Sequence, residues 1–211
     1  MKLFSYFRSS ATWRVRIALH WKGLAFESVL VNLLEGAQRR PEYLALNPQG
    51  LVPTLVDGDL VLGQSLAILE YLEEIRPLPP LLPGSAAERA RARQLALMVA
   101  CEIHPLQNLG VRRLLREEFG LDEEAERRFA RPAIERGLRA VEAVLRERPA
   151  GPFCCGERPT LADVCLVPQL YNARRFGADL AGLERVLSAE AACAPLEAFA
   201  RAAPEAQPDA V

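Results

Sequence analysis

The spacing of hydrophobic positions along the chain changes at about residue 80. Before that point, short apolar runs rich in β-branched and aromatic residues alternate with stretches of helical spacing. Beyond it, strand-like alternation disappears and Ala, Leu, Arg and Glu dominate. Short apolar runs predict strands, whereas apolar residues three and four positions apart predict amphipathic helices. The pattern therefore predicts an α/β first half and an all-helical second half.

In the first half, the order of elements is β-α-β followed by β-β-α. This order favours a mixed four-stranded sheet with helices on its faces, the thioredoxin-like arrangement. Asp57-Gly58 marks a hairpin turn, and Pro53 at the start of a strand is allowed with a cis Val52-Pro53 bond. The predicted strands are residues 2–6, 26–31, 51–56 and 60–62, and the predicted helices begin at Trp13, Pro41 and Ser65, with Ser65 as a cap.

A stiff Pro-rich linker, residues 77–85, separates the halves. We therefore predict an α/β domain over residues 1–78 and a helical domain over residues 86–211. Residues 95–103 are apolar almost all round, which predicts a central helix buried on several sides, and His104-Pro105 should kink it or begin a new segment. Further helices are predicted over residues 123–146 and 160–176. The second opens with Thr160 and Asp163 in a capping-box pattern.

Composition narrows the classes of function. The chain has 211 residues, half of them hydrophobic, and a formal net charge of -1 with no block of like charge. Nothing therefore indicates nucleic acid or an anionic membrane surface as a partner. No N-terminal apolar targeting region or long apolar run is present, so we expect a cytoplasmic protein that does not span a membrane. The five cysteines show no metal-ligand spacing with the two histidines.

Candidate chemistry lies in the hydroxyl-rich loop between the first strand and the first helix. Ser9, Ser10 and Thr12 stand where unpaired backbone N–H groups and the helix dipole favour an anion. Such a site can hold a thiolate, because a helix N-terminus and a hydroxyl donor lower the pKa of a thiol. The alternative is that Ser10 or Thr12 only caps the helix. His104 and Asn108, four residues apart, are expected to share a helix face, and a hydrogen-bonded core histidine is the alternative for His104.

Motifs from end to end of the chain resemble the zeta class of the cytosolic glutathione transferases. The motifs follow one another in the same order as in that class, and one of them is the Ser-Ser loop before Trp-Arg-Val-Arg. The motifs are residues 7–19, Ala45-Leu46-Asn47-Pro48, Val52-Pro53-Thr54-Leu55, residues 64–68, Gln107-Asn108-Leu109, Leu161-Ala162-Asp163, Val167-Pro168-Gln169, residues 172–176 and Gln207-Pro208-Asp209.

This resemblance implies glutathione as the cofactor and assigns roles residue by residue. Ser9 or Ser10 would hold the glutathione sulfur as a thiolate, and Arg175 would bind the carboxylate of a small-molecule substrate, with Arg8 sharing that task. Ser9, Ser10 and Arg175 are the implied catalytic residues. The implied glutathione-binding residues are Ser9, Ser10, Thr12, Gln38, Val52, Pro53, Gln64, Ser65, His104 and Asn108.

The activity that the resemblance implies is the glutathione-dependent isomerisation of maleylacetoacetate to fumarylacetoacetate in tyrosine and phenylalanine catabolism. It also implies a homodimer. Ala11 stands where the class usually has Cys, and Leu109-Gly110 lacks the arginine that some related maleylpyruvate isomerases carry just after the Asn108 region. Maleylpyruvate isomerisation, transfer of glutathione to α-haloacids, and a non-catalytic binding protein of the same fold remain the alternatives.

Overall fold

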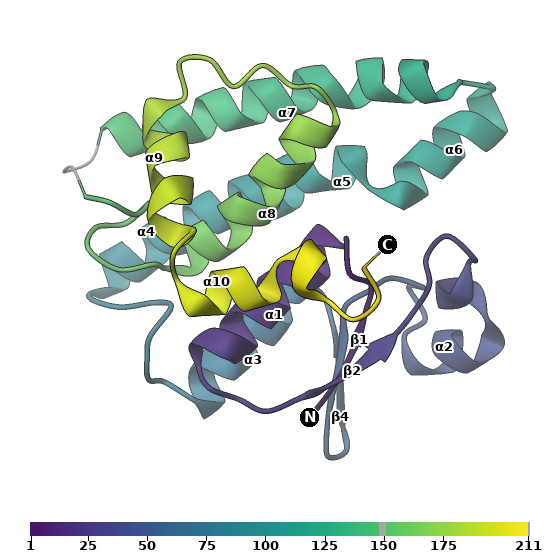
Figure 1. The fold of residues 1–211 in the computed structure, drawn as a ribbon, viewed down its shortest axis with the longest axis horizontal. Coiled ribbons are helices and arrows are strands. Elements are labelled where there is room, and N and C mark those ends of the chain that lie inside the picture. Colours follow the sequence, from purple (N-terminus) through teal and green to yellow (C-terminus); the bar gives the residue numbers. More distant parts are fainter. Residues whose placement is uncertain (148–150, 211) are drawn as a thin grey trace. The chain divides into compact units, whose positions relative to one another are not determined.

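The computed structural model describes residues 1–147 and 151–210. They form two compact units: Met1–Leu81 with the chain from Ala194 onward, and Leu82–Cys193. The boundary between the two units, after Leu81, falls within the predicted linker of residues 77–85. The C-terminal segment, which the sequence prediction placed in the helical half, groups with the sheet instead. The reason is that α10 (Glu197–Ala202) packs along α1 (Ser10–Trp21), as Figure 1 shows.

A four-stranded mixed sheet organises the first unit, as predicted. Its strands are β1 (Lys2–Ser5), β2 (Glu27–Leu30), β3 (Thr54–Asp57) and β4 (Leu60–Gly63), in the order β2-β1-β3-β4. β1 pairs in parallel with β2 and antiparallel with β3, and β3 pairs antiparallel with β4. Leu3 faces Leu55 across the β1–β3 pair, and both side chains are buried, so the register places their apolar face in the core.

Helices lie on both sides of these strands. α1 packs against α3 (Ser65–Ile75) and α10, while α2 (Pro41–Leu46) lies across the strands from them (Figure 1). Two short 3-10 turns, η1 (Ala37–Arg39) and η3 (Pro204–Ala206), complete the unit. The predicted cap of α3 is shifted by one residue: Gln64 is the N-cap and Ser65 is the first helical residue.

The second unit contains only helices among its described residues. α8 packs against α4, α7 and α9 (Figure 1), and it is buried along nearly its whole length. The elements are α4 (Ala86–Leu97), the π-helix η2 (Met98–Ile103), α5 (His104–Gln107), α6 (Leu109–Phe119), α7 (Glu123–Arg146), α8 (Leu161–Arg175) and α9 (Glu184–Cys193).

The predicted capping box at the start of α8 is confirmed. Asp163, fully buried, accepts hydrogen bonds from the backbone N–H (2.8 Å) and the hydroxyl (3.0 Å) of Thr160. It also accepts one from the backbone N–H of Cys154 at 2.8 Å. Burial raises the pKa of Asp163, and these hydrogen bonds oppose that rise. The carboxylate therefore joins the loop before α8 to the first turn of the helix.

The prediction that residues 95–103 are buried on several sides is wrong. Val99 and Ile103 are buried, but Leu97 is 46% exposed, and Cys101 and Glu102 are exposed. The helix changes from α to π geometry after Leu97, so only one face of η2 points into the core. An apolar composition therefore did not indicate burial on all sides.

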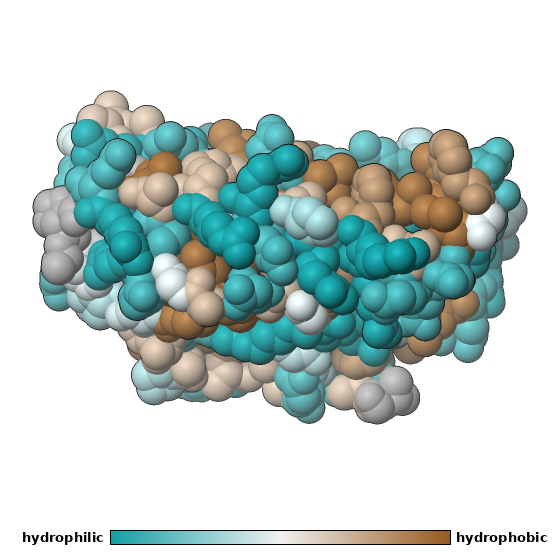
Figure 2. Space-filling model, turned by 90° about the horizontal axis from the view of Figure 1, so that it is seen from above, coloured by the Kyte–Doolittle hydropathy of each residue, from teal (hydrophilic) through white to brown (hydrophobic). Residues whose placement is uncertain are grey.

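α6 carries apolar side chains that the unit does not cover. Leu114 is 52% exposed and Phe119 is 68% exposed, and Phe129 of α7 is 44% exposed. Figure 2 shows hydrophobic surface at the end of the molecule where α6 and α7 lie. α6 is tied to α7 by charge instead of by apolar burial, because Arg112 and Arg116 both pair with Glu126.

No helix in the described residues is long and apolar enough to cross a membrane. Nor do the described histidines, cysteines and carboxylates form a cluster of three that could hold a metal ion.

Candidate functional site

The Ser-Ser loop connects β1 to α1. Ser9 is the N-cap of α1, and its Oγ accepts a hydrogen bond from the backbone N–H of Thr12 at 3.3 Å. Ser9 is partly exposed, whereas Ser10 is 4% exposed and Thr12 is fully buried. Capping therefore falls to Ser9 and not to Ser10 or Thr12, and Ser9 is also the most accessible hydroxyl of the three. Its hydroxyl hydrogen remains able to donate to an anion at this helix end.

Two residues that the sequence analysis did not assign hold this loop in place. Arg16 donates to the carbonyl oxygens of Phe7 (2.7 Å), Tyr6 (3.4 Å) and Ala202 (3.0 Å). Asp209 accepts from the backbone N–H of Phe7 at 2.9 Å. Burial lowers the pKa of Arg16 to about 10, although the charge of Asp209 raises it. The C-terminal tail thus fixes the chain just before Arg8 and Ser9.

The peptide bond between Val52 and Pro53 is cis, which is one of the arrangements that the sequence allows. Among the described residues, neither the backbone N–H nor the carbonyl of Val52 has a hydrogen-bond partner. The chain on each side is fixed, because Nδ2 of Asn47 donates to the carbonyl of Leu51 (2.8 Å) and to Oγ1 of Thr54 (3.0 Å). Val52 therefore has unpaired backbone groups just before β3, suited to pair with an extended peptide.

The start of α3 carries backbone strain. Gln64 has a φ of 63°, the only positive φ of a non-glycine residue in the described chain. Such a conformation costs on the order of 1–3 kcal/mol and is typical of functional sites. The Gln64 side chain is exposed and donates to Oε1 of Gln49 at 2.8 Å, and no side chain caps the helix. The first N–H groups of α3 are therefore open to an anion.

Gln38 and Arg8 complete the predicted residues of the first unit. Gln38 lies in η1 and is 6% exposed, and its buried Oε1 has no hydrogen-bond partner among the described residues. A buried acceptor without a partner costs free energy and is typical of a ligand site. Arg8 is partly exposed, with its guanidinium carbon 5.5 Å from the centre of the Phe7 ring.

The second unit carries the predicted residues His104, Asn108 and Arg175. The expectation that His104 and Asn108 share one helix face is wrong. α5 ends at Gln107, and Asn108 has an extended backbone because it is the N-cap of α6. His104 is half-buried, and Oδ1 of Asn108 accepts from the backbone N–H of Gly110 at 3.5 Å.

Arg175 ends α8 and is exposed, and its Nη1 donates to Oδ1 of Asn172 at 3.0 Å. The next residue, Phe176, is buried and lies under Arg112, whose guanidinium carbon is 5.6 Å from the ring centre. Arg112 in turn donates through Nε to buried Glu126 at 2.8 Å. Sequence analysis could not find this cluster, because its partners come from three helices.

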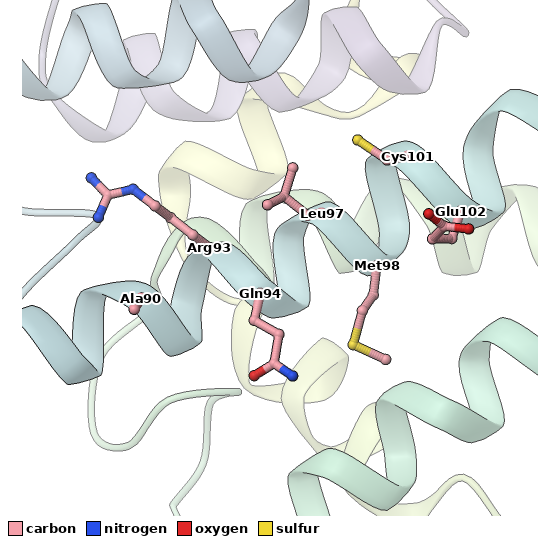
Figure 3. A pocket seen from close by; sticks show the side chains of 7 residues that line it. All are labelled: Ala90, Arg93, Gln94, Leu97, Met98, Cys101 and Glu102. Carbon is pink, nitrogen blue, oxygen red and sulfur yellow. The ribbon is translucent and has the colours of Figure 1, made fainter.

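The α4–η2 face carries an open hollow of about 550 Å³. Figure 3 shows that its lining side chains all project from this one continuous stretch of helix. None of the predicted site residues lines it. The lining residues are Ala90, Arg93, Gln94, Leu97, Met98, Cys101 and Glu102.

Family models match both units of the chain. The model described as the glutathione S-transferase N-terminal domain matches residues 8–75, and that of the C-terminal domain matches residues 86–203. The chain belongs to the zeta class of the glutathione S-transferase family. Its similarity to individual members of this class extends over the whole length.

Maleylacetoacetate isomerase of Rhizobium meliloti is 50% identical to the chain over 204 residues, which cover 96% of this chain and 95% of the relative. Among solved structures, a bacterial zeta-class maleylpyruvate isomerase in its holo form matches with a TM-score of 0.98 and 46% identity over the full length of both chains. Maleylacetoacetate isomerase from Methylobacterium extorquens, with bound malonate and glutathione, matches with a TM-score of 0.96 and 45% identity, again over both full lengths.

Proposed function

We propose that the protein is a glutathione-dependent cis–trans isomerase that converts maleylacetoacetate to fumarylacetoacetate in tyrosine and phenylalanine catabolism. The observation that carries the proposal is 50% identity over nearly the full length to a maleylacetoacetate isomerase, together with an accessible Ser9 hydroxyl at the start of α1. The structure of the Methylobacterium extorquens maleylacetoacetate isomerase with bound glutathione and malonate supports both the cofactor and a carboxylate substrate.

Several residues of the first unit have unused polar groups that suit parts of the glutathione molecule. Val52 offers an unpaired backbone edge for the cysteinyl part, and the open N–H groups beside Gln64 suit the γ-glutamyl carboxylate. The buried Oε1 of Gln38 is an unused acceptor. Ser10, Thr12, Pro53, Ser65, His104 and Asn108 stay proposed members of the binding site.

Glutathione, when bound, supplies a thiolate that adds reversibly to the conjugated double bond and so permits rotation about it. Ser9 would donate its hydroxyl hydrogen to this sulfur, and the N-terminal end of α1 would favour its negative charge. Arg175 would bind the substrate carboxylate through its planar guanidinium, with Arg8 as a second cation. These arginines would also stabilise the negative charge that develops on the substrate carbonyl.

Replacing Ser9 tests this mechanism. Ser9→Ala removes the hydroxyl donor, so we expect kcat for maleylacetoacetate to fall about a hundredfold while the dissociation constant for glutathione changes less than about threefold. Ser85→Ala, which alters an exposed cap of α4 outside every proposed site, is the matched control. Turnover near that of the wild type in Ser9→Ala would exclude the role of Ser9.

Maleylpyruvate is the second candidate substrate, favoured by the TM-score of 0.98 to a maleylpyruvate isomerase. A spectrophotometric assay with each substrate, with and without glutathione, separates the candidates. Formation of the trans isomer without consumption of glutathione supports isomerisation, and the larger kcat/KM identifies the substrate. Consumption of glutathione with α-haloacids and no isomerisation would support a transferase instead.

The zeta-class resemblance also supports a homodimer. Half-exposed Leu97 and the hollow beside it provide apolar surface that a second copy would cover. Sedimentation of the protein at the monomer mass at micromolar concentration would contradict the dimer. A cytoplasmic location is likewise a proposal, supported by five free cysteines.

A further inference from the structure

Arg14 is a buried cation beside the start of α3. It lies on α1, only 1% of its surface is exposed, and its Nη1 donates to Oγ of Ser65 at 3.2 Å. Ser65 is the first residue of α3 and is 7% exposed. The guanidinium of Arg14 therefore lies directly behind the first turn of this helix.

The direction of this hydrogen bond determines what Ser65 can do. A guanidinium has donors and no acceptor, so Oγ of Ser65 must accept from Arg14. The hydroxyl hydrogen of Ser65 is then directed away from Arg14 and is available to another acceptor. Since no side chain caps α3, the N–H groups of its first turn are donors at the same place.

We propose that Arg14 is a positioning residue that orients the Ser65 hydroxyl toward the α-carboxylate of the γ-glutamyl group of glutathione. This inference rests on the proposed function, because it requires glutathione at the start of α3. Arg14 acts through Ser65 and does not touch the ligand, since only 1% of its surface is exposed. The strained Gln64 holds the backbone turn at which Ser65 begins the helix.

The test compares glutathione with an analogue that lacks only the α-carboxylate, 4-aminobutanoyl-cysteinyl-glycine. Their dissociation constants are measured by calorimetry for the wild type, Arg14→Lys and Arg14→Met. We expect Arg14→Met to weaken binding of glutathione about tenfold and binding of the analogue less than twofold. Arg14→Lys should retain part of the preference, because it keeps the charge but shortens the donor.

Ser65→Ala provides a variant that keeps the buried arginine. It should reduce the preference for glutathione over the analogue, and adding Arg14→Lys to it should reduce the preference little further, since both changes remove the same interaction. Equal loss for both ligands in the Arg14 variants would show a merely structural role and overturn the proposal. So would a Ser65→Ala protein with the preference of the wild type, even if the Arg14 variants do not fold.

The two proposals fail in different ways. If the wild type binds glutathione and isomerises substrate but shows no preference over the analogue, the role of Arg14 is excluded and the proposed function stands. If the wild type binds neither glutathione nor the analogue, the proposed function fails, and the role of Arg14 fails with it.

Discussion

Asp163→Ala should destabilise the second unit strongly, because it removes a buried acceptor that serves four donors. Two of these donors are the backbone N–H groups of Thr160 and Cys154, both at 2.8 Å. The others are the Thr160 hydroxyl at 3.0 Å and the Cys154 thiol. Asp163 is fully buried, so water does not replace the lost carboxylate without further opening of the structure.

The magnitude follows from the donors left behind. A buried N–H group without an acceptor costs about 1–3 kcal/mol, so two such groups cost about 2–6 kcal/mol. The Thr160 hydroxyl can rotate toward another acceptor and adds little. We therefore expect a loss of about 4 kcal/mol in the free energy of unfolding, which is a large part of the stability of an ordinary domain.

Urea unfolding followed by circular dichroism measures this loss. Glu88→Ala is the matched control, because Glu88 holds the same position in the capping box of α4, where its carboxylate accepts from the backbone N–H of exposed Ser85 at 2.7 Å. Water can replace that acceptor, so the control should shift the midpoint far less. Midpoint shifts of equal size in the two variants would refute the argument from burial.

Two further predictions concern packing and pH. In α7, a Cβ on Gly137 would lie 2.3 Å from Cγ1 of Ile103, so Gly137→Ala should lower the free energy of unfolding by about 1–2 kcal/mol. A Cβ on Gly110 would meet no atom within 4 Å, so Gly110→Ala should raise the free energy of unfolding. Equal changes in the two variants would exclude the packing explanation. Burial raises the pKa of Glu142, but hydrogen bonds from Arg146 and from two N–H groups at the start of α9 outweigh it and leave the pKa lowered. The stability that ionised Glu142 contributes is therefore present above the unfolded-state pKa and is lost as pH falls through the folded-state pKa. The Tm of Glu142→Gln should approach that of the wild type at low pH. A Tm difference that is independent of pH would contradict this.

Elements with local signals were predictable from the sequence. The Asp57-Gly58 turn and the capping box of α8 each depend on residues close together in the chain, and the structure confirms both. Strand ends differ from the predicted ends by up to three residues, because pairing with neighbouring strands decides where a ladder stops.

α6 shows why the rest could not be predicted. None of the α6 residues is buried, so the hydrophobic periodicity of this helix does not indicate what it packs against. What anchors it is Glu126, a fully buried acid on α7 that pairs with Arg112 and Arg116. Two arginines facing one buried carboxylate are a long-range arrangement, and the sequence alone shows only a charged amphipathic stretch.

The hydroxyl loop shows the same limit at the candidate site. Sequence reasoning identified Ser9 and Ser10 by their place before a helix, which is a local signal. The groups that fix the loop, Arg16 and the tail residue Asp209, come from a helix interior and from the far end of the chain. Asp209 belongs to a motif of the zeta class, but its function as an acceptor for Phe7 follows only from the folded structure.

α1 places two arginines in the interior, and both donate to groups that border the candidate site. Arg16 uses its donors on backbone carbonyls before Ser9, while Arg14 donates to the Ser65 hydroxyl. Burying a cation is costly unless donors find acceptors, so each arginine stabilises the fold only while these loops keep their observed positions. The same bonds that offset the burial of charge in α1 therefore hold the β1–α1 loop and the start of α3, the two places where we propose that glutathione binds.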